Sequence, residues 1–191
     1  MNDPAFPTKS GAGPTDAALV VAARAGESWA QEALFVRYGK YVLGLSHRLL
    51  AHPAEAEDLA QDAFVQAFTR LDSLKNPQAF AAWLGRIVVH TAHKRLRRRR
   101  LLARLGLARA EPTDPDALVS PNAPADVASD LKRLYAVLNE LGAEERIALV
   151  LRRVEGLGLS EIAEQMDVSL ATVKRRLVAA EARLNELRDR F

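Results

Sequence analysis

Three consecutive basic residues, Lys174, Arg175 and Arg176, stand near the start of a predicted helix late in the 191-residue chain. Ammonium and guanidinium groups bind phosphates, and a helix that carries them can present side chains to base edges in a DNA groove. The surrounding stretch at 159–177, LSEIAEQMDVSLATVKRRL, has the periodicity of two short helices joined by a tight turn. This pattern predicts contact with DNA. A plain helical hairpin with a solvated basic face is the alternative.

The apolar residues of this stretch divide into two inner faces. Ile162, Ala163 and Met166 form one face, and Val173 and Leu177 form the other. The small alanine at the expected helix crossing and the short turn are typical of a helix-turn-helix, with Ser169 placed to cap the second helix. The residues predicted to face DNA are Ser169, Ala171, Thr172, Lys174, Arg175 and Arg176.

A second basic region lies between residues 73 and 110, where the chain has ten basic residues and no acidic one. Within it, one side of a predicted helix carries Arg86, His90, Lys94 and Arg97 at i, i+4, i+8 and i+11, a line that can follow a phosphate backbone. Two aromatic residues lie beside this line. Trp83 is expected in the core. For Phe80, packing in the core and stacking on a base are equally open. A solvated basic face is the alternative.

An acidic and amide-rich helix face comes before this basic region. In AEAEDLAQDAFVQAF at 54–68, apolar side chains form an inner face, and no Lys or Arg lies at i, i+4 from the acids. Beside a basic region that faces DNA, such a face suits a protein partner better than nucleic acid, although the acids can also be merely solvated. Its members are Glu57, Asp58, Gln61, Asp62 and Gln66.

The sequence argues against an enzyme and against a membrane protein. Cysteine is absent, which excludes disulfides, thiol nucleophiles and cysteine-based zinc sites. His47, His90 and His93 are not expected to bind a metal, because the nearby cations would repel it. No phosphate-binding loop or nucleophile motif occurs, so we expect no catalytic residue and no cofactor. The apolar run at 17–23 is too short to span a membrane, and we expect a cytoplasmic protein.

Helices must position these residues, because composition and periodicity predict an all-α fold of two small domains. Residues 1–14 are expected to be a disordered tail, and 15–102 a bundle of four helices with breaks at Gly26, Pro53 and 74–78. Residues 103–130, rich in proline and acid toward their end, are expected to form a flexible linker. Residues 131–191 are the second domain, which holds the predicted helix-turn-helix.

Three motifs in this order resemble those of the extracytoplasmic-function sigma factors of bacterial RNA polymerase: AEDLAQ at 56–61, WLGRIVVH at 83–90, and EGLGLSEIAEQMDVSLATVKRRL at 155–177. The resemblance implies that residues 15–102 are region 2, which binds core polymerase and the −10 promoter element, and that 131–191 are region 4, which binds the −35 element. It also implies assistance in promoter opening, and an anti-sigma factor as a possible further partner.

The resemblance assigns roles to residues. Core polymerase would be bound by Asp58, Gln61, Asp62 and Gln66. The −10 element would be bound by Lys75, Asn76, Phe80, Arg86, His90, Lys94, Arg97 and Arg98. The −35 element would be bound by the six residues predicted above to face DNA.

The chain departs from the family pattern at the −10 helix. His90 stands where the family usually has asparagine, and Lys94 where an acid is common. Nearby cations disfavour a charged imidazole, so a neutral His90 ring is expected to stack on or hydrogen-bond to the opened strand. Two other functions remain open: a helix-turn-helix regulator that binds duplex DNA alone, and a helical adaptor whose basic region binds acidic proteins or lipids.

Overall fold

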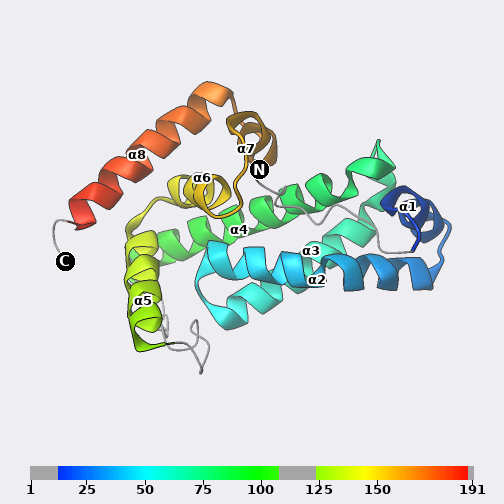
Figure 1. Ribbon diagram of the computed structural model, residues 1–191, viewed down its shortest axis with the longest axis horizontal. Helices are drawn as coiled ribbons and strands as arrows, with labels where there is room; N and C mark the ends of the chain where they lie inside the picture. Colours follow the sequence, from blue (N-terminus) through cyan, green and yellow to red (C-terminus); the bar gives the residue numbers. More distant parts are fainter. Residues whose placement is uncertain (1–12, 108–123, 189–191) are drawn as a thin grey trace.

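The computed structural model describes residues 13–107 and 124–188, and all regular elements in these ranges are helices. The prediction of an all-α fold is confirmed (Figure 1). The first range contains α1 (Asp16–Arg24), α2 (Ser28–Leu50), α3 (Pro53–Thr69), the 3-10 turns η1 (Leu71–Ser73) and η2 (Pro77–Ala79), and α4 (Phe80–Arg104). The second contains α5 (Ala125–Glu140), α6 (Ala143–Arg153), α7 (Leu159–Met166) and α8 (Leu170–Arg188).

Helices α1 to α4 form the N-terminal half, and the predicted breaks separate them. Gly26, with φ of +88°, lies between α1 and α2, where the left-handed conformation strains any residue with a Cβ. Ala51 ends α2 in the left-handed region, and Pro53 then begins α3 with its ring where no amide donor is needed. The Tyr38 and Phe80 rings pack in the bundle core with centroids 5.4 Å apart.

Helices α5 to α8 form the C-terminal half, and α7 and α8 are the predicted helix-turn-helix. Asp167 ends α7 in the left-handed conformation with φ of 52°, which lets the chain turn within a few residues. The Ser169 hydroxyl then accepts a hydrogen bond of 3.2 Å from the amide of Thr172, as expected for a capping residue. Ile162 and Val173 are fully buried between the helices.

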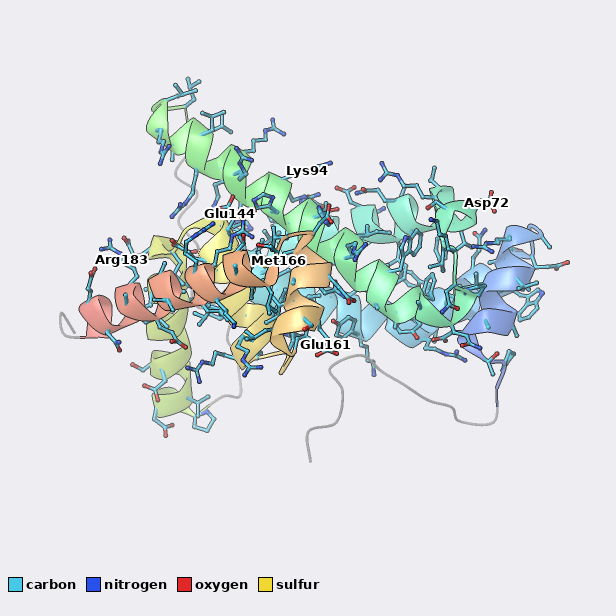
Figure 2. The ribbon with its side chains drawn as sticks, turned by 90° about the horizontal axis from the view of Figure 1, so that it is seen from above. Asp72, Lys94, Glu144, Glu161, Met166 and Arg183 are labelled. Carbon is cyan, nitrogen blue, oxygen red and sulfur yellow. The ribbon has the colours of Figure 1, made fainter. Side chains whose placement is uncertain are left out.

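The two halves share one apolar core, because α6 and α7 pack against α4 (Figures 1 and 2). Polar contacts join them as well. Arg48 Nε donates to Glu155 Oε1 at 2.6 Å, and the His93 and Glu144 side chains meet at 2.9 Å. Gln165 is buried and donates to the carbonyl of Ala82 at 3.0 Å. The halves are therefore held together by both burial and hydrogen bonds.

The predicted linker is corrected at its end. Helix α5 begins at Ala125, so residues 125–130 are helical, although we expected them to belong to the linker. The stretch after Pro124 contains no further proline, and Asp126 in the first turn complements the positive end of the helix dipole. Residues 108–123 and most of the predicted tail lie outside the described residues. The domain boundaries themselves stay predictions.

The buried ring of Phe80 gives a prediction for stability. Phe80→Ala should lower the free energy of unfolding by about 3–5 kcal/mol, since it leaves a cavity in a packed core. Phe35→Ala is the matched control, because that ring is 50% exposed, and it should cost about 1 kcal/mol. Urea denaturation followed by circular dichroism measures both values. Equal losses would contradict the placement of Phe80.

Candidate nucleic-acid interface

A cavity of about 300 Å³ opens on the polar side of α4, where it faces the end of α3 and the turn η1. It brings together Arg86, His90 and Lys94, three of the residues predicted to bind the −10 element. They converge because residues four apart lie on the same side of a helix. The complete lining consists of Gln66, Arg70, Ser73, Trp83, Arg86, Ile87, His90, Thr91 and Lys94.

The charges of this cavity suit a polyanion. Arg70, Arg86 and Lys94 contribute three cations, and none of the lining residues is acidic. Trp83 was expected in the core. It is half-buried, and only part of its side chain packs against the core. The indole also lines the cavity, where a base can stack on an aromatic ring. Cations and one aromatic ring at a single opening can hold a phosphate and an unstacked base.

His90 is half-buried at this opening, and its pKa is lowered from the usual 6.5. Burial is the largest cause; Asp167 opposes it, and Arg86, His93 and Lys94 add to it. The sequence predicted the direction, but it assigned the effect to the cations alone. A neutral imidazole can donate from one ring nitrogen and accept at the other, so His90 is equipped to hydrogen-bond a base edge.

Phe80 must be removed from the predicted −10 set, because its ring is 0% exposed in the core. The other members outside the cavity are exposed. Lys75 and Asn76 lie between η1 and η2, where the Asn76 side chain accepts a hydrogen bond from the Gln78 amide at 3.1 Å. Arg97 and Arg98 follow the cavity along α4. Sequence reasoning missed Arg70, which follows α3 and reaches the cavity only through the packing of α3 on α4.

The predicted DNA-facing residues of α8 lie at its beginning, as expected from the helix-turn-helix. Ser169, Ala171, Lys174 and Arg175 are exposed, whereas Thr172 and Arg176 are half-buried. The Ser169 hydroxyl contacts the Thr172 hydroxyl at 2.9 Å in addition to capping the helix. Arg176 lies toward α6, close enough for its charge to act on Glu144. The side chains best placed to reach DNA are therefore Ala171, Lys174 and Arg175.

The predicted polymerase-binding residues of α3 divide between two sides of that helix. Asp58 and Gln61 are exposed. Asp62 forms an ion pair with Arg95 of α4, and Gln66 donates to the Thr91 hydroxyl at 3.2 Å. The absence of a basic partner along α3 thus did not mean that Asp62 is unpaired.

Gln61 also lines a groove between α2 and α3, which we call the α2–α3 groove. Its volume is about 720 Å³, and its lining is mostly apolar. Val36 is 71% exposed there, Val65 59% and Phe35 50%. The sequence holds a signal for these residues, since Phe35 and Val36 fall outside the buried stripe of Leu34, Tyr38 and Val42. The groove is lined by Phe35, Val36, Gly39, Lys40, Leu43, Glu57, Ala60, Gln61, Phe64, Val65 and Phe68.

Comparison with known proteins identifies the family. The Sigma-70 region 2 model matches residues 34–101, and the Sigma-70 region 4 model matches 131–184. The ECF RNA polymerase sigma factor SigM of Mycobacterium tuberculosis is 33% identical over 176 residues, which cover 91% of this chain and 84% of that protein. The ECF RNA polymerase sigma-E factor of Escherichia coli K12 is 31% identical over 181 residues, which cover 87% of this chain and 90% of that protein. The chain belongs to the extracytoplasmic-function sigma factors.

Two solved structures share the fold of this chain. CnrH in complex with the cytosolic domain of CnrY superposes with a TM-score of 0.63 at 28% identity, covering 91% of this chain and 97% of that one. The sigma factor RpoE from Bartonella quintana, in complex with the anti-sigma factor NepR, superposes with a TM-score of 0.64, covering 83% of this chain and 96% of that one. Because the two sequences are only 24% identical, this likeness supports the fold and nothing more. None of the described helices is long and apolar enough to cross a membrane.

The lowered pKa of His90 predicts how the stability of this sigma factor depends on pH. A histidine whose pKa is lower in the folded than in the unfolded state contributes stability above the unfolded value of 6.5 and loses it as the pH falls below that value. His90→Asn should therefore flatten the loss of stability below pH 6.5, while His47 contributes to the loss that remains because its pKa is also lowered by burial. Urea unfolding at a series of pH values measures this, and parallel curves for the two proteins would contradict the burial of His90.

Proposed function

We propose that this sigma factor reads the opened −10 strand with the cavity on α4, reads the −35 duplex with the start of α8, and binds core polymerase with α2 and α3. The observation that carries the proposal is the cavity itself, in which Arg86, His90 and Lys94 surround one opening beside Trp83. Polymerase catalyses RNA synthesis, and the sigma factor supplies binding energy and specificity in the cytoplasm.

The energetics of promoter opening explain why the cavity needs both cations and an aromatic ring. Separating base pairs loses stacking of about 1.4 kcal/mol per step, and extruding a base costs a few more. Stacking of one base on an aromatic side chain returns about 1–3 kcal/mol, and the cations add phosphate contacts whose strength falls with salt. A volume of about 300 Å³ is at the lower end of small-molecule sites, which suits one base better than a larger ligand.

The distance between the promoter elements requires the two halves to separate on the promoter. Elements named −35 and −10 are about 25 base pairs apart, and at 3.4 Å per pair this is roughly 85 Å. In the structure, Asp167 at the end of α7 is close enough to His90 to act on its pKa. The packed arrangement therefore belongs to the free sigma factor, and the polymerase holds the halves apart.

The α2–α3 groove supports the assignment of the polymerase-binding surface. Exposed apolar residues at the centre with Lys40, Glu57 and Gln61 among the lining residues are typical of a protein interface. An amphipathic helix fits such a groove, and the resemblance to the family assigns the coiled coil of the polymerase clamp to this domain. Asp58 and Gln61 remain candidates for polar contacts at this surface, whereas Asp62 and Gln66 face α4.

An anti-sigma factor is a second proposed partner. The solved complex of RpoE with NepR names such a partner for that protein. The exposed apolar side chains of the α2–α3 groove can accept only one protein at a time, so an anti-sigma factor bound there would exclude core polymerase. Competition for the purified sigma factor between the two proteins tests this directly.

Run-off transcription with core polymerase on a library of promoters tests the proposed function. The wild-type sigma factor should start transcription at a defined set of promoters, and His90→Asn should change the base preferred in the −10 element while the −35 preference stays the same. Binding of duplex DNA without transcription would favour the lone helix-turn-helix regulator. Failure to bind either core polymerase or DNA would favour the helical adaptor.

Val65 gives the prediction for polymerase binding. Val65→Asp places a charge in the α2–α3 groove and should weaken binding of core polymerase by about tenfold or more, that is about 1.4 kcal/mol. Val21→Asp is the matched control, because both valines are 59% exposed and Val21 lies on α1, outside the groove. Fluorescence anisotropy of the labelled sigma factor measures both affinities. Equal affinities for the two variants would remove the groove from the interface.

Lys174 gives the prediction for the recognition helix. Lys174→Ala in the holoenzyme should weaken binding to all −35 sequences by a similar factor and reduce the slope of log K against log salt by about one. Arg183→Ala is the control, since it removes a cation near the other end of α8, where Arg183 pairs with Glu186. Salt titrations on promoter fragments give the slopes. A change in base preference would instead assign Lys174 to base reading.

A further inference from the structure

Arg146 is a buried cation that contacts no carboxylate among the described residues. It lies near the start of α6 and is 1% exposed. Its Nη1 donates to the side-chain oxygen of Asn139 at 2.8 Å, while Nε and Nη2 are buried without a hydrogen-bond partner. Buried arginines are normally paired with an acid, because desolvation of an uncompensated charge is costly. Within the described part of the chain, Arg146 therefore has two buried donors without a partner.

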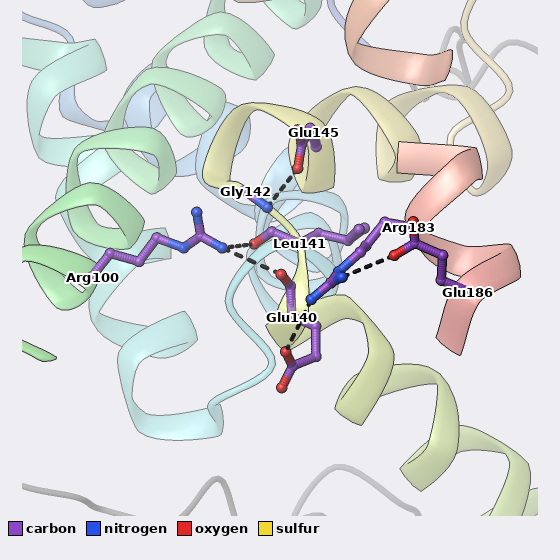
Figure 3. A network of polar contacts seen from close by, with 7 residues as sticks. All are labelled: Arg100, Glu140, Leu141, Gly142, Glu145, Arg183 and Glu186. Carbon is purple, nitrogen blue, oxygen red and sulfur yellow. Dashed lines mark hydrogen bonds and ion pairs between the residues drawn. The ribbon is translucent and has the colours of Figure 1, made fainter. Parts of the chain in front are cut away.

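The acids next to Arg146 in the sequence point elsewhere (Figure 3). Glu145 turns back to accept a hydrogen bond of 2.8 Å from the amide of Gly142. Glu140 lies 4.0 Å from Arg183 of α8, and Glu144 contacts His93 at 2.9 Å. Each nearby carboxylate is thus engaged with another group, so a small rearrangement of these acids would break existing contacts before it neutralised Arg146.

Arg146 opens instead into a cavity of about 190 Å³ between the two halves. Helix α4 contributes Arg99 and Arg100, which makes three guanidinium groups in one lining that has no acidic member. Arg99 also donates to the side-chain oxygen of Asn139, at 3.4 Å, and Arg100 reaches the carbonyl of Leu141 (Figure 3). The lining is Leu96, Arg99, Arg100, Ala103, Asn139, Leu141, Ala143 and Arg146.

The buried charge persists at neutral pH. Burial and then the neighbouring Arg99 lower the pKa of Arg146 to about 10, which still leaves the guanidinium protonated. Proton loss is therefore not the way in which the site is neutralised. A bound anion in the cavity would supply the missing negative charge.

We propose that the cavity between α4 and the α5–α6 turn binds a small oxyanion of the phosphate class. Its volume corresponds to about six water molecules at roughly 30 Å³ each, enough for a phosphate group with some of its hydration. It is below the range of about 300–1,000 Å³ for drug-sized ligands, so a nucleoside would have to lie outside. Planar guanidinium groups match the geometry of phosphate oxygens. The site is independent of the proposed promoter contacts.

An anion at this position would join the two halves, since Arg99 and Arg100 belong to α4 whereas Asn139 and Arg146 belong to the C-terminal half. A ligand that binds only the packed arrangement stabilises that arrangement by mass action. Phosphate should therefore make separation of the halves harder and so make the sigma factor slower to engage polymerase.

Thermal unfolding of the full chain with inorganic phosphate, against chloride at equal ionic strength, tests the site. Phosphate at a hundredfold excess over its dissociation constant should raise the melting temperature by about 5–10 °C, saturably. Phosphorus NMR should show broadening of the phosphate line on addition of the protein. No rise beyond that given by chloride would overturn the proposal.

Asn139→Asp is the decisive variant. It places a carboxylate within reach of Arg146 and Arg99, so it should raise the melting temperature without phosphate and abolish the phosphate response. Asn185→Asp is the control, because it makes the same change at an exposed position of α8 and should keep the response. An equal phosphate response in the two variants would contradict the site.

Two further comparisons make the test specific. Arg99→Met should lose the phosphate response, and Arg97→Met, which removes an exposed arginine of the same helix outside the lining, should keep it. Adenosine monophosphate distinguishes the sources of the phosphate group. A stronger response to this nucleotide than to inorganic phosphate assigns the site to phosphomonoesters, and a weaker one assigns it to the free ion. Loss of the response in Arg97→Met as well would indicate general charge effects and overturn the proposal.

Discussion

Helix α4 packs with one side against α2 and α3 and with another against α6 and α7. Leu84, Val88 and Leu96 are buried in the resulting core. Along the side of α4 that this packing leaves open, Arg86, His90 and Lys94 fall in one line. The cations of the candidate −10 site are thus gathered on the open side of α4.

The same packing holds the end of α7 close to the cavity on α4, so the two surfaces proposed to bind DNA would have to move apart to span a promoter. Gln165 of α7 donates to the backbone of α4, and His93 and Arg48 reach across to acids of the C-terminal half. Apolar burial of α6 and α7 against α4 adds to these polar contacts. In the proposed promoter complex, core polymerase and DNA would replace this burial while they hold the halves apart.

Local patterns in the sequence predicted the helices, their breaks and the helix-turn-helix, because the spacing of apolar residues and the capping of α8 by Ser169 are encoded by near neighbours. The burial of Phe80 and the pairing of Asp62 with Arg95 depend on residues far apart in the chain. So do the groove beside Val65 and the buried charge of Arg146. Periodicity says which face of a helix is apolar, but it does not say which neighbour covers that face.

The distance between the two halves shows whether they separate when the sigma factor binds polymerase and a promoter. The chain has no cysteine, so cysteines introduced at the exposed positions Ala82 and Glu164, on opposite sides of the joint beside the Gln165–Ala82 hydrogen bond, can carry a pair of spin or fluorescent labels without competing sites. We expect one short distance in the free sigma factor and an increase on the order of tens of ångströms when core polymerase and promoter DNA are added. An unchanged distance in a complex that transcribes would contradict it.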